Sequence, residues 1–190
     1  MAGPIITSRD KLKAPLAQKK RAMPRITKKY SMSPERNSLF EEMEKQFEEK
    51  NISYFKKLLA HKDSVVRTRA VCILAEIAGE AAVNPIGKVL KEDDNDLVRH
   101  EAAFSLGQLG FSSGIKLLAD AVKNDSSLFV RHEAAVALGV IGSEEARKTL
   151  NAALADESEE VRDSAVVALA NLDYIKAVNR KNDFTRLTGG

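Results

Sequence analysis

The chain has 190 residues, of which 44% are hydrophobic and 5% aromatic, with no tryptophan. This length and composition predict one medium-sized domain whose core consists of Ala, Val, Leu and Ile, as stacked helices prefer. The single cysteine excludes an internal disulfide bond, and we expect no membrane contact because no apolar run approaches the length of a membrane span. Since the amino terminus also lacks the hydrophobic core of a secretion signal, we expect a cytoplasmic protein.

Charge is divided unevenly along the chain. Ten Lys or Arg side chains against two acidic ones give residues 1–36 a net charge of +8, so the rest of the chain carries −5 of the total of +3. Residues 1–36 also hold four of the five prolines and have no sustained apolar period. We expect this segment to be a basic tail that is disordered unless bound, because it cannot offset the entropy cost of folding alone.

Basic side chains of this tail are candidates for contacts with RNA, on the ribosome or elsewhere, because they attract phosphate backbones by counterion release. These candidates are Lys19, Lys20, Arg21, Arg25, Lys28 and Lys29. The alternative is a solvated tail with no dedicated partner, because no folded RNA-binding motif accompanies it.

An acidic amphipathic helix is predicted over residues 38–49. Its apolar side consists of Leu39, Phe40, Met43 and Phe47. We expect this helix to cap the first end of the domain, since the terminal units of a repeat array need a cover.

A repeat of about 32 residues occupies most of the remaining chain. Its Val-Arg anchor recurs in steps of 32, 32 and 31 residues, with the arginines at Arg67, Arg99, Arg131 and Arg162. Such a period is typical of a solenoid. After each anchor, apolar residues recur at three- and four-residue spacing, which predicts one apolar stripe along an inner helix.

A second, outer helix is predicted before each inner one, at residues 52–59, 83–91, 115–122 and 144–154. Gly79, Gly110 and Gly142 follow the inner helices where a left-handed residue ends a helix, and Ser143 supplies a capping hydroxyl for the last outer helix. No stretch alternates with period two, so a sheet finds no support. The sequence therefore predicts an all-α fold, an α-solenoid of about four helix pairs over residues 37–178, followed by a C-terminal tail at 179–190.

Two His-Glu pairs occupy the same place in consecutive repeats, His100 with Glu101 and His132 with Glu133. Imidazole and carboxylate groups bind iron and other borderline transition metals, and the period of the fold would line them up in space. We expect the two histidines to lean together and share one metal ion. The alternative is a polar row that merely faces solvent.

Glycine follows each histidine by two helical turns, at Gly107 and Gly139, where the flanking repeats have Ala75 and Ala170. Glycine inside a helix costs on the order of 1 kcal/mol relative to alanine. We therefore expect these glycines to leave space for a ligand or a partner helix.

Other conspicuous residues have structural interpretations. The four anchor arginines recur in repeats with and without histidine, so they are interpreted as scaffold residues that hold neighbouring turns or carbonyl groups. Cys72 is expected to be a small buried hydrophobe on the apolar side of its helix. His61 has no partner in register and is expected at the surface.

From Leu97 to Ala170, the runs RHEAAFSLGQLG, VRHEAAVALGVIG and VRDSAVVALANLD resemble deoxyhypusine hydroxylase, a HEAT-repeat family of the phycobilin-lyase-like repeat class. That family has two similar halves, each with two His-Glu motifs about 32 residues apart, and the four motifs together bind a di-iron centre that activates dioxygen. The resemblance implies that this chain corresponds to one half.

The chain departs from the family pattern in ligand number, because it supplies two histidines and two glutamates in place of four of each. A homodimer would duplicate every ligand and restore the count. The resemblance then implies that His100 and His132 of one chain hold one iron with a glutamate, Glu101 or Glu133, of the other. The identity of the metal, and a separate partner chain in place of a second copy, stay open.

Two functional hypotheses follow. In the first, a dimeric di-iron monooxygenase hydroxylates an extended cationic side chain on the concave face, which by resemblance is deoxyhypusine on translation factor 5A; a net-negative solenoid suits such a substrate. In the second, a non-enzymatic HEAT-repeat scaffold binds a protein on its concave face, and its basic tail anchors it to RNA or the ribosome. The first explains the registered His-Glu pairs better, and the second explains the tail better.

Overall fold

The computed structural model describes residues 33–178. The candidate RNA contacts Lys19, Lys20, Arg21, Arg25, Lys28 and Lys29, and the predicted tail at 179–190, lie outside the described residues. Within this range the chain forms helices and no strand, as predicted. The α-helices are α1 (Pro34–Glu48), α2 (Ile52–Leu58), α3 (Ser64–Ala78), α4 (Val83–Glu92), α5 (Asp96–Leu109), α6 (Ile115–Asn124), α7 (Leu128–Ile141), α8 (Arg147–Ala153) and α9 (Glu159–Val178).

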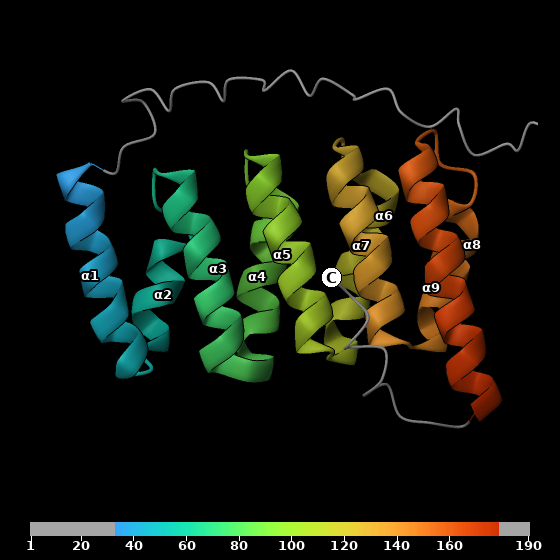
Figure 1. Ribbon diagram of the computed structural model, residues 1–190, viewed down its shortest axis with the longest axis horizontal. Coiled ribbons are helices and arrows are strands. Elements are labelled where there is room, and N and C mark those ends of the chain that lie inside the picture. Colours follow the sequence, from blue (N-terminus) through green and yellow to red (C-terminus); the bar gives the residue numbers. More distant parts are fainter. Residues whose placement is uncertain (1–32, 179–190) are drawn as a thin grey trace, which may run out of the picture. The chain divides into compact units, whose positions relative to one another are not determined.

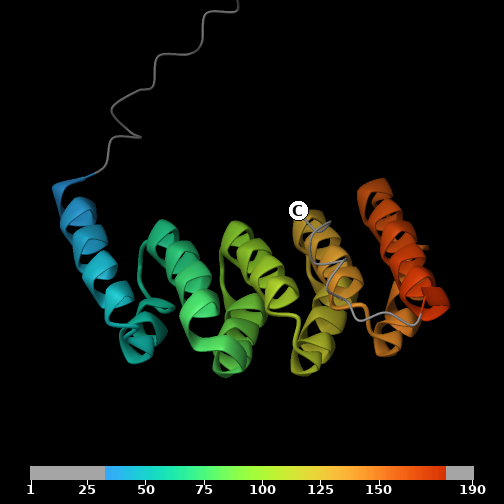
Figure 2. The same cartoon turned by 60° about the horizontal axis from the view of Figure 1, so that its bottom comes forward.

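Four helix pairs make up the repeats of the described chain: α2 with α3, α4 with α5, α6 with α7 and α8 with α9. The inner helices α3, α5, α7 and α9 pack side by side in one layer, and the outer helices form a second layer behind them (Figures 1 and 2). The predicted α-solenoid of about four pairs is therefore confirmed. The outer helices lie within a few residues of their predicted positions.

Each inner helix buries the apolar stripe that its sequence predicts. On α5, Val98, Ala102 and Leu106 are at most 1% exposed, and the equivalent residues of α7 are as deeply buried. Because every layer of this core lies between two repeats, one helix pair could not bury it alone.

The turns after the inner helices depend on glycine. Gly110 and Gly142 have φ angles of 68° and 69° in the left-handed region, as the C-cap prediction requires. Gly79 also has a positive φ of 53°, but its ψ of −135° leads directly into a short 3₁₀ helix, Gly79–Ala82, instead of a left-handed cap.

The first helix begins earlier than predicted. Helix α1 begins at Pro34, which is favoured in a first helical turn, and the Ser33 hydroxyl accepts a hydrogen bond from the Arg36 amide at 3.2 Å. Met43 is fully buried in the core, and the Arg69 guanidinium lies 4.7 Å from the centre of the Phe40 ring. The part of α1 from Ser38 onward therefore covers the first repeat, as expected of a capping helix.

One segment contradicts the expectation that no run approaches a membrane span. Ser64–Glu92 is long and apolar enough to cross a membrane by length and composition alone. It is not one continuous α-helix, because it comprises α3 and α4 with the turn at Gly79 between them. Its large apolar residues Leu74 and Ile86 are fully buried in the core, which accounts for its hydropathy.

Candidate functional site

The two His-Glu pairs lie near the N-terminal ends of two neighbouring inner helices. His100 and Glu101 belong to α5, and His132 and Glu133 to α7. The start of α5 is fixed by Asn95, whose side chain accepts hydrogen bonds from the amides of the second and third residues that follow it. Helices α5 and α7 lie side by side (Figure 1), so we expect residues at equivalent positions of the two helices to lie on the same side of the layer.

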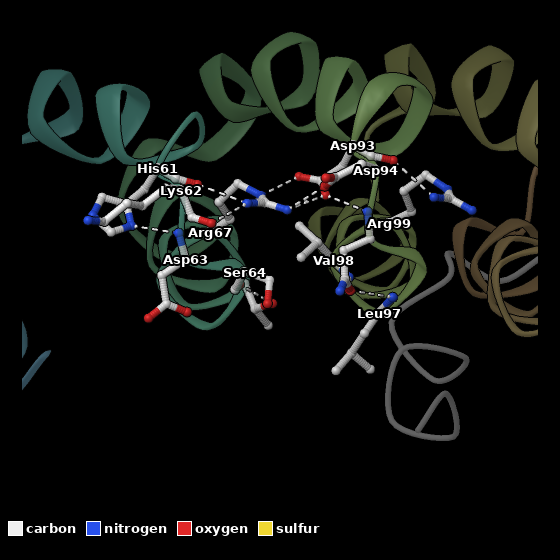
Figure 3. A network of polar contacts seen from close by, with 12 residues as sticks. His61, Lys62, Asp63, Ser64, Arg67, Asp93, Asp94, Leu97, Val98 and Arg99 are labelled. Atoms are coloured by element: carbon white, nitrogen blue, oxygen red, sulfur yellow. Dashed lines mark hydrogen bonds and ion pairs between the residues drawn. The ribbon is translucent and has the colours of Figure 1, made fainter. Parts of the chain in front are cut away.

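The anchor arginine near the start of each inner helix binds the turns beside that helix. Arg67 binds Asp93 through two nitrogens at 2.7 and 2.8 Å, and it also donates to the carbonyl oxygen of His61 (Figure 3). Arg99 repeats this pattern one repeat later with Asp125 and the carbonyl oxygen of Asp93.

Further along the chain, Arg131 and Arg162 continue the series, and both contact the turn around Asp156. The scaffold interpretation of the four arginines is confirmed. Burial raises the pKa of Asp93 and of Asp156, but the hydrogen bonds and charges of Arg67 and Arg131, together with hydrogen bonds from backbone amides, outweigh burial and hold both pKa values below their ordinary value.

All four predicted metal-binding side chains line one open cavity of about 740 Å³. Polar groups from α9 and apolar side chains from all three helices complete its walls. These further lining residues are Phe104, Val136, Glu160, Asp163, Ser164 and Val167. Residues that share a register position in the sequence therefore line one cavity in the structure.

Within the cavity, the contacts run diagonally from one repeat to the next. His100 Nε2 lies 3.3 Å from Glu133 Oε2, and His132 Nδ1 lies 2.6 Å from Ser164 Oγ. In both cases the first residue after the anchor arginine meets the second residue after the anchor of the following repeat. The Glu133 hydrogen bond raises the pKa of His100 above its ordinary value, against the opposing effect of burial.

These contacts correct the expectation that the two histidines lean together. His100 pairs with Glu133 and His132 with Ser164, and no contact that the described residues make joins the two imidazoles. The offset arises because each histidine side chain leans toward the next inner helix. The histidine is the first residue after its own anchor arginine, and it contacts the second residue after the anchor arginine of that next helix.

The donor chemistry of the cavity suits iron, but one chain does not complete a site. Imidazole nitrogens and carboxylate oxygens are the donors of non-haem iron centres, and the 3.3 Å separation shows that donors from neighbouring repeats reach the same small volume. Among residues 33–178, however, no group of three or more His, Cys, Asp or Glu side chains converges to hold a metal ion. A metal site at this cavity would therefore need donors beyond those that residues 33–178 bring together.

The glycines make room for a neighbouring helix of the same chain, and the predicted alternative of a ligand is wrong. A Cβ atom on Gly107 would lie 2.8 Å from Ala137 Cβ, and one on Gly139 would lie 2.7 Å from Ala168 Cβ. The space beside each glycine is therefore filled by the next inner helix and not by a ligand. The absence of a side chain lets α5, α7 and α9 approach closely enough for the diagonal contacts to form.

Cys72 is exposed, so its predicted burial is wrong. It lies on the face of α3 that turns toward α5, and its Sγ lies 3.1 Å from Glu101 Oε1. Neighbouring atoms still partly desolvate the thiol, and together with the hydrogen bond and charge of Glu101 they raise the pKa of Cys72 to about 12. His61 is half-buried and accepts a hydrogen bond from the Asp63 amide, so it caps a turn and stands apart from the cavity.

Sequence reasoning missed the side chains that flanking repeats contribute. Cys72 from α3 contacts Glu101 at one end of the series, and Ser164 from α9 contacts His132 at the other. Ser164 was detectable in principle, because it occupies the register position of Glu101 and Glu133 in a repeat that lacks the His-Glu pair.

Comparisons with known proteins support the fold. A family model described as HEAT repeats matches residues 45–107 and 83–170. The solved structure of human deoxyhypusine hydroxylase in complex with glycerol is similar to this chain, with a TM-score of 0.64 and 28% sequence identity. The similarity covers 70% of this chain and 47% of that one, so this chain spans about half the length of the human protein. None of the curated proteins matches the sequence significantly.

Proposed function

The chain belongs to the HEAT-repeat family, and from that premise we propose that it is half of a di-iron monooxygenase of the deoxyhypusine hydroxylase type, completed by a second copy of itself. The observation that carries this proposal is the single cavity into which consecutive repeats bring His100, Glu101, His132 and Glu133.

A twofold dimer supplies what one chain lacks. It brings four histidines and four glutamates to one place, because a symmetric interface presents the same residues from both chains. In such a dimer the His100 ring would turn from Glu133 of its own chain, so that His100 and His132 would hold one iron together with Glu101 or Glu133 of the other chain. When bound by such donors with open positions, iron supplies dioxygen activation.

The reaction inserts one oxygen atom of O₂ into a C–H bond of the substrate and reduces the other to water, with two electrons and two protons from an external reductant.

The chain's own residues bind and orient the substrate. Phe104, Val136 and Val167 form an apolar wall suited to an aliphatic side chain, and Glu160 and Asp163 suit a terminal cation. By analogy with the similar structure, we propose deoxyhypusine as that side chain.

Metal content and solution mass test the proposal together. Protein purified without chelator, with ferrous iron supplied, is expected to be a dimer with about one iron per chain. His100→Ala and His132→Ala are expected to lose the iron while keeping their helicity, whereas His61→Ala, the matched control outside the cavity, keeps it. A metal-free monomer, or equal iron in all three variants, would contradict the proposal.

A second candidate function is supported by a separate observation, a row of exposed apolar side chains. Val65, Leu97 and Phe129 occupy the same position two residues before the anchor arginine and are 47%, 66% and 63% exposed. Exposed apolar side chains in a row are typical of a protein-binding surface. Together with the +8 charge of residues 1–36, this row supports a scaffold that binds a protein and is anchored to RNA. A metal-free monomer whose RNA affinity falls steeply with salt would favour this function.

A further inference from the structure

The hydrogen bonds around His132 fix where its ring carries a proton. His132 Nδ1 lies 2.6 Å from the hydroxyl oxygen of Ser164, which is 6% exposed, and 3.4 Å from the backbone carbonyl oxygen of Glu160. Both groups belong to α9, so one ring nitrogen faces the neighbouring helix.

Two oxygen atoms beside Nδ1 favour one direction for these bonds. Ser164 Oγ also lies 2.7 Å from the Glu160 carbonyl oxygen, which can only accept, so when this hydrogen bond forms the hydroxyl proton points away from the ring. The oxygen lone pair that Ser164 presents to the ring then accepts a hydrogen bond from the Nδ1–H group. In a neutral imidazole with its proton on Nδ1, Nε2 carries the free lone pair.

We propose that Ser164 is a positioning residue that holds the neutral His132 ring with its proton on Nδ1 and leaves the Nε2 lone pair to bind a metal ion. Metal-binding histidines commonly donate their second ring N–H to a neighbouring acceptor, which fixes both tautomer and orientation. The identity of the ligand rests on the proposed function, whereas the tautomer rests on the hydrogen bonds of the free chain.

This role distinguishes the two histidines. His100 directs Nε2 at Glu133, whereas His132 directs Nδ1 at Ser164. A glutamate at position 164 would form an ion pair with His132, as Glu133 does with His100. Serine instead offers an uncharged acceptor that fixes the ring without competing for its other nitrogen.

Nitrogen NMR of the metal-free, full-length protein tests the inference. At a pH where the imidazoles are neutral, the ¹⁵N shifts of His132 are expected to show a proton on Nδ1 and none on Nε2. Ser164→Ala is expected to shift the ring toward the Nε2–H tautomer, and Ser164→Thr, which keeps the hydroxyl, is expected to restore Nδ1–H. Ser105→Ala removes the second buried serine of the inner helices and serves as the control, with His132 unchanged.

Two results would overturn the inference. One is a folded wild-type protein in which His132 is protonated on Nε2, and the other is a Ser164→Ala protein with normal helicity and an unchanged tautomer. If Ser164→Ala does not fold, the spectra of the wild type and Ser164→Thr still decide.

Metal affinity provides a second measurement. Loss of the Ser164 hydroxyl is expected to weaken iron binding by roughly 10- to 100-fold, the usual effect of removing a group that orients a metal-binding histidine. A wild-type protein that binds no iron yet keeps the Nδ1–H tautomer contradicts the proposed function and leaves the inference standing. Iron binding of unchanged strength in Ser164→Ala contradicts the inference.

Discussion

His100 Nε2 contacts Glu133 Oε2 across the interface between α5 and α7, at 3.3 Å. The two residues are 33 positions apart, one more than the 32-residue step between their anchor arginines. The same diagonal offset recurs between His132 and Ser164, so it follows from how the inner helices stack and not from the local sequence around one residue. The contact between His100 and Glu133 places an imidazole and a carboxylate from different repeats at the cavity to which the proposed iron site is assigned.

Close helix approach at glycine is expected to limit substitution there. Gly107→Ala and Gly139→Ala should destabilise the fold by about 1–3 kcal/mol, although alanine favours helices, because the added methyl meets backbone as well as side-chain atoms of the next helix. Denaturant unfolding measures the change. The control is Gly114→Ala, whose added methyl would lie 3.9 Å from its nearest neighbour.

A compensating substitution sharpens this test. Replacing Ala137 by glycine in the Gly107→Ala background should recover part of the lost stability, because it removes the Cβ that the new methyl meets. Strictly additive losses in the double variant would show that the glycine does not act through helix approach.

The arginine contacts allow a matched comparison of buried and exposed carboxylates. Asp93 and Asp94 both contact Arg67 at 2.7 Å, but their side chains are 5% and 92% exposed. Asp93→Ala is expected to cost about 3 kcal/mol or more, because it removes the two hydrogen bonds of the buried carboxylate and leaves the buried guanidinium only the solvated carboxylate of Asp94 as a counter-charge. Asp94→Ala is expected to cost less than about 1 kcal/mol, since its ion pair is solvated. Equal losses in thermal or denaturant unfolding would contradict this account.

Acid stability should depend on the same carboxylates. The pKa values of Asp93 and Asp156 are lower in the folded chain than their ordinary value, so each contributes stability at neutral pH. That contribution is fully present above the ordinary value near 3.8 and is lost as the pH falls through the lower folded pKa. Asp156→Asn is therefore expected to be less stable at pH 7 and to show a flatter loss of stability between about pH 5 and pH 2. A wild-type slope in the variant would refute this assignment.

Cys72 is expected to be accessible but unreactive. With its pKa raised to about 12, the thiol contains very little thiolate at pH 8, so alkylation by iodoacetamide should be much slower than in the unfolded chain. Glu101→Gln removes the negative charge beside the sulfur and should accelerate alkylation. An equal rate in the variant and the wild type would show that Glu101 does not control the thiol.

Local periodicity predicted most of the fold, because it depends on contacts that every repeat makes. The apolar stripe of Val98 and Leu106, the arginine contacts and the glycine caps are all such features. The contacts between two repeats were predicted less accurately from the sequence, because a one-residue offset between neighbouring helices decides which side chains touch. The partners of His100 and His132, the exposure of Cys72 and the close approach at Gly107 all depend on that offset.

The central claim is that two chains share one iron site, and complementation between variants tests it most directly. Chain one carries His100→Ala and His132→Ala, chain two carries Glu101→Gln and Glu133→Gln, and differently tagged copies are co-expressed and purified as the heterodimer. Each variant alone should bind no iron, whereas the heterodimer should bind about one iron ion, half of the wild-type content. Only one of its two sites is intact, the site that combines the histidines of chain two with the glutamates of chain one. An iron-free heterodimer beside an iron-loaded wild type, or full iron in either variant alone, would contradict the account.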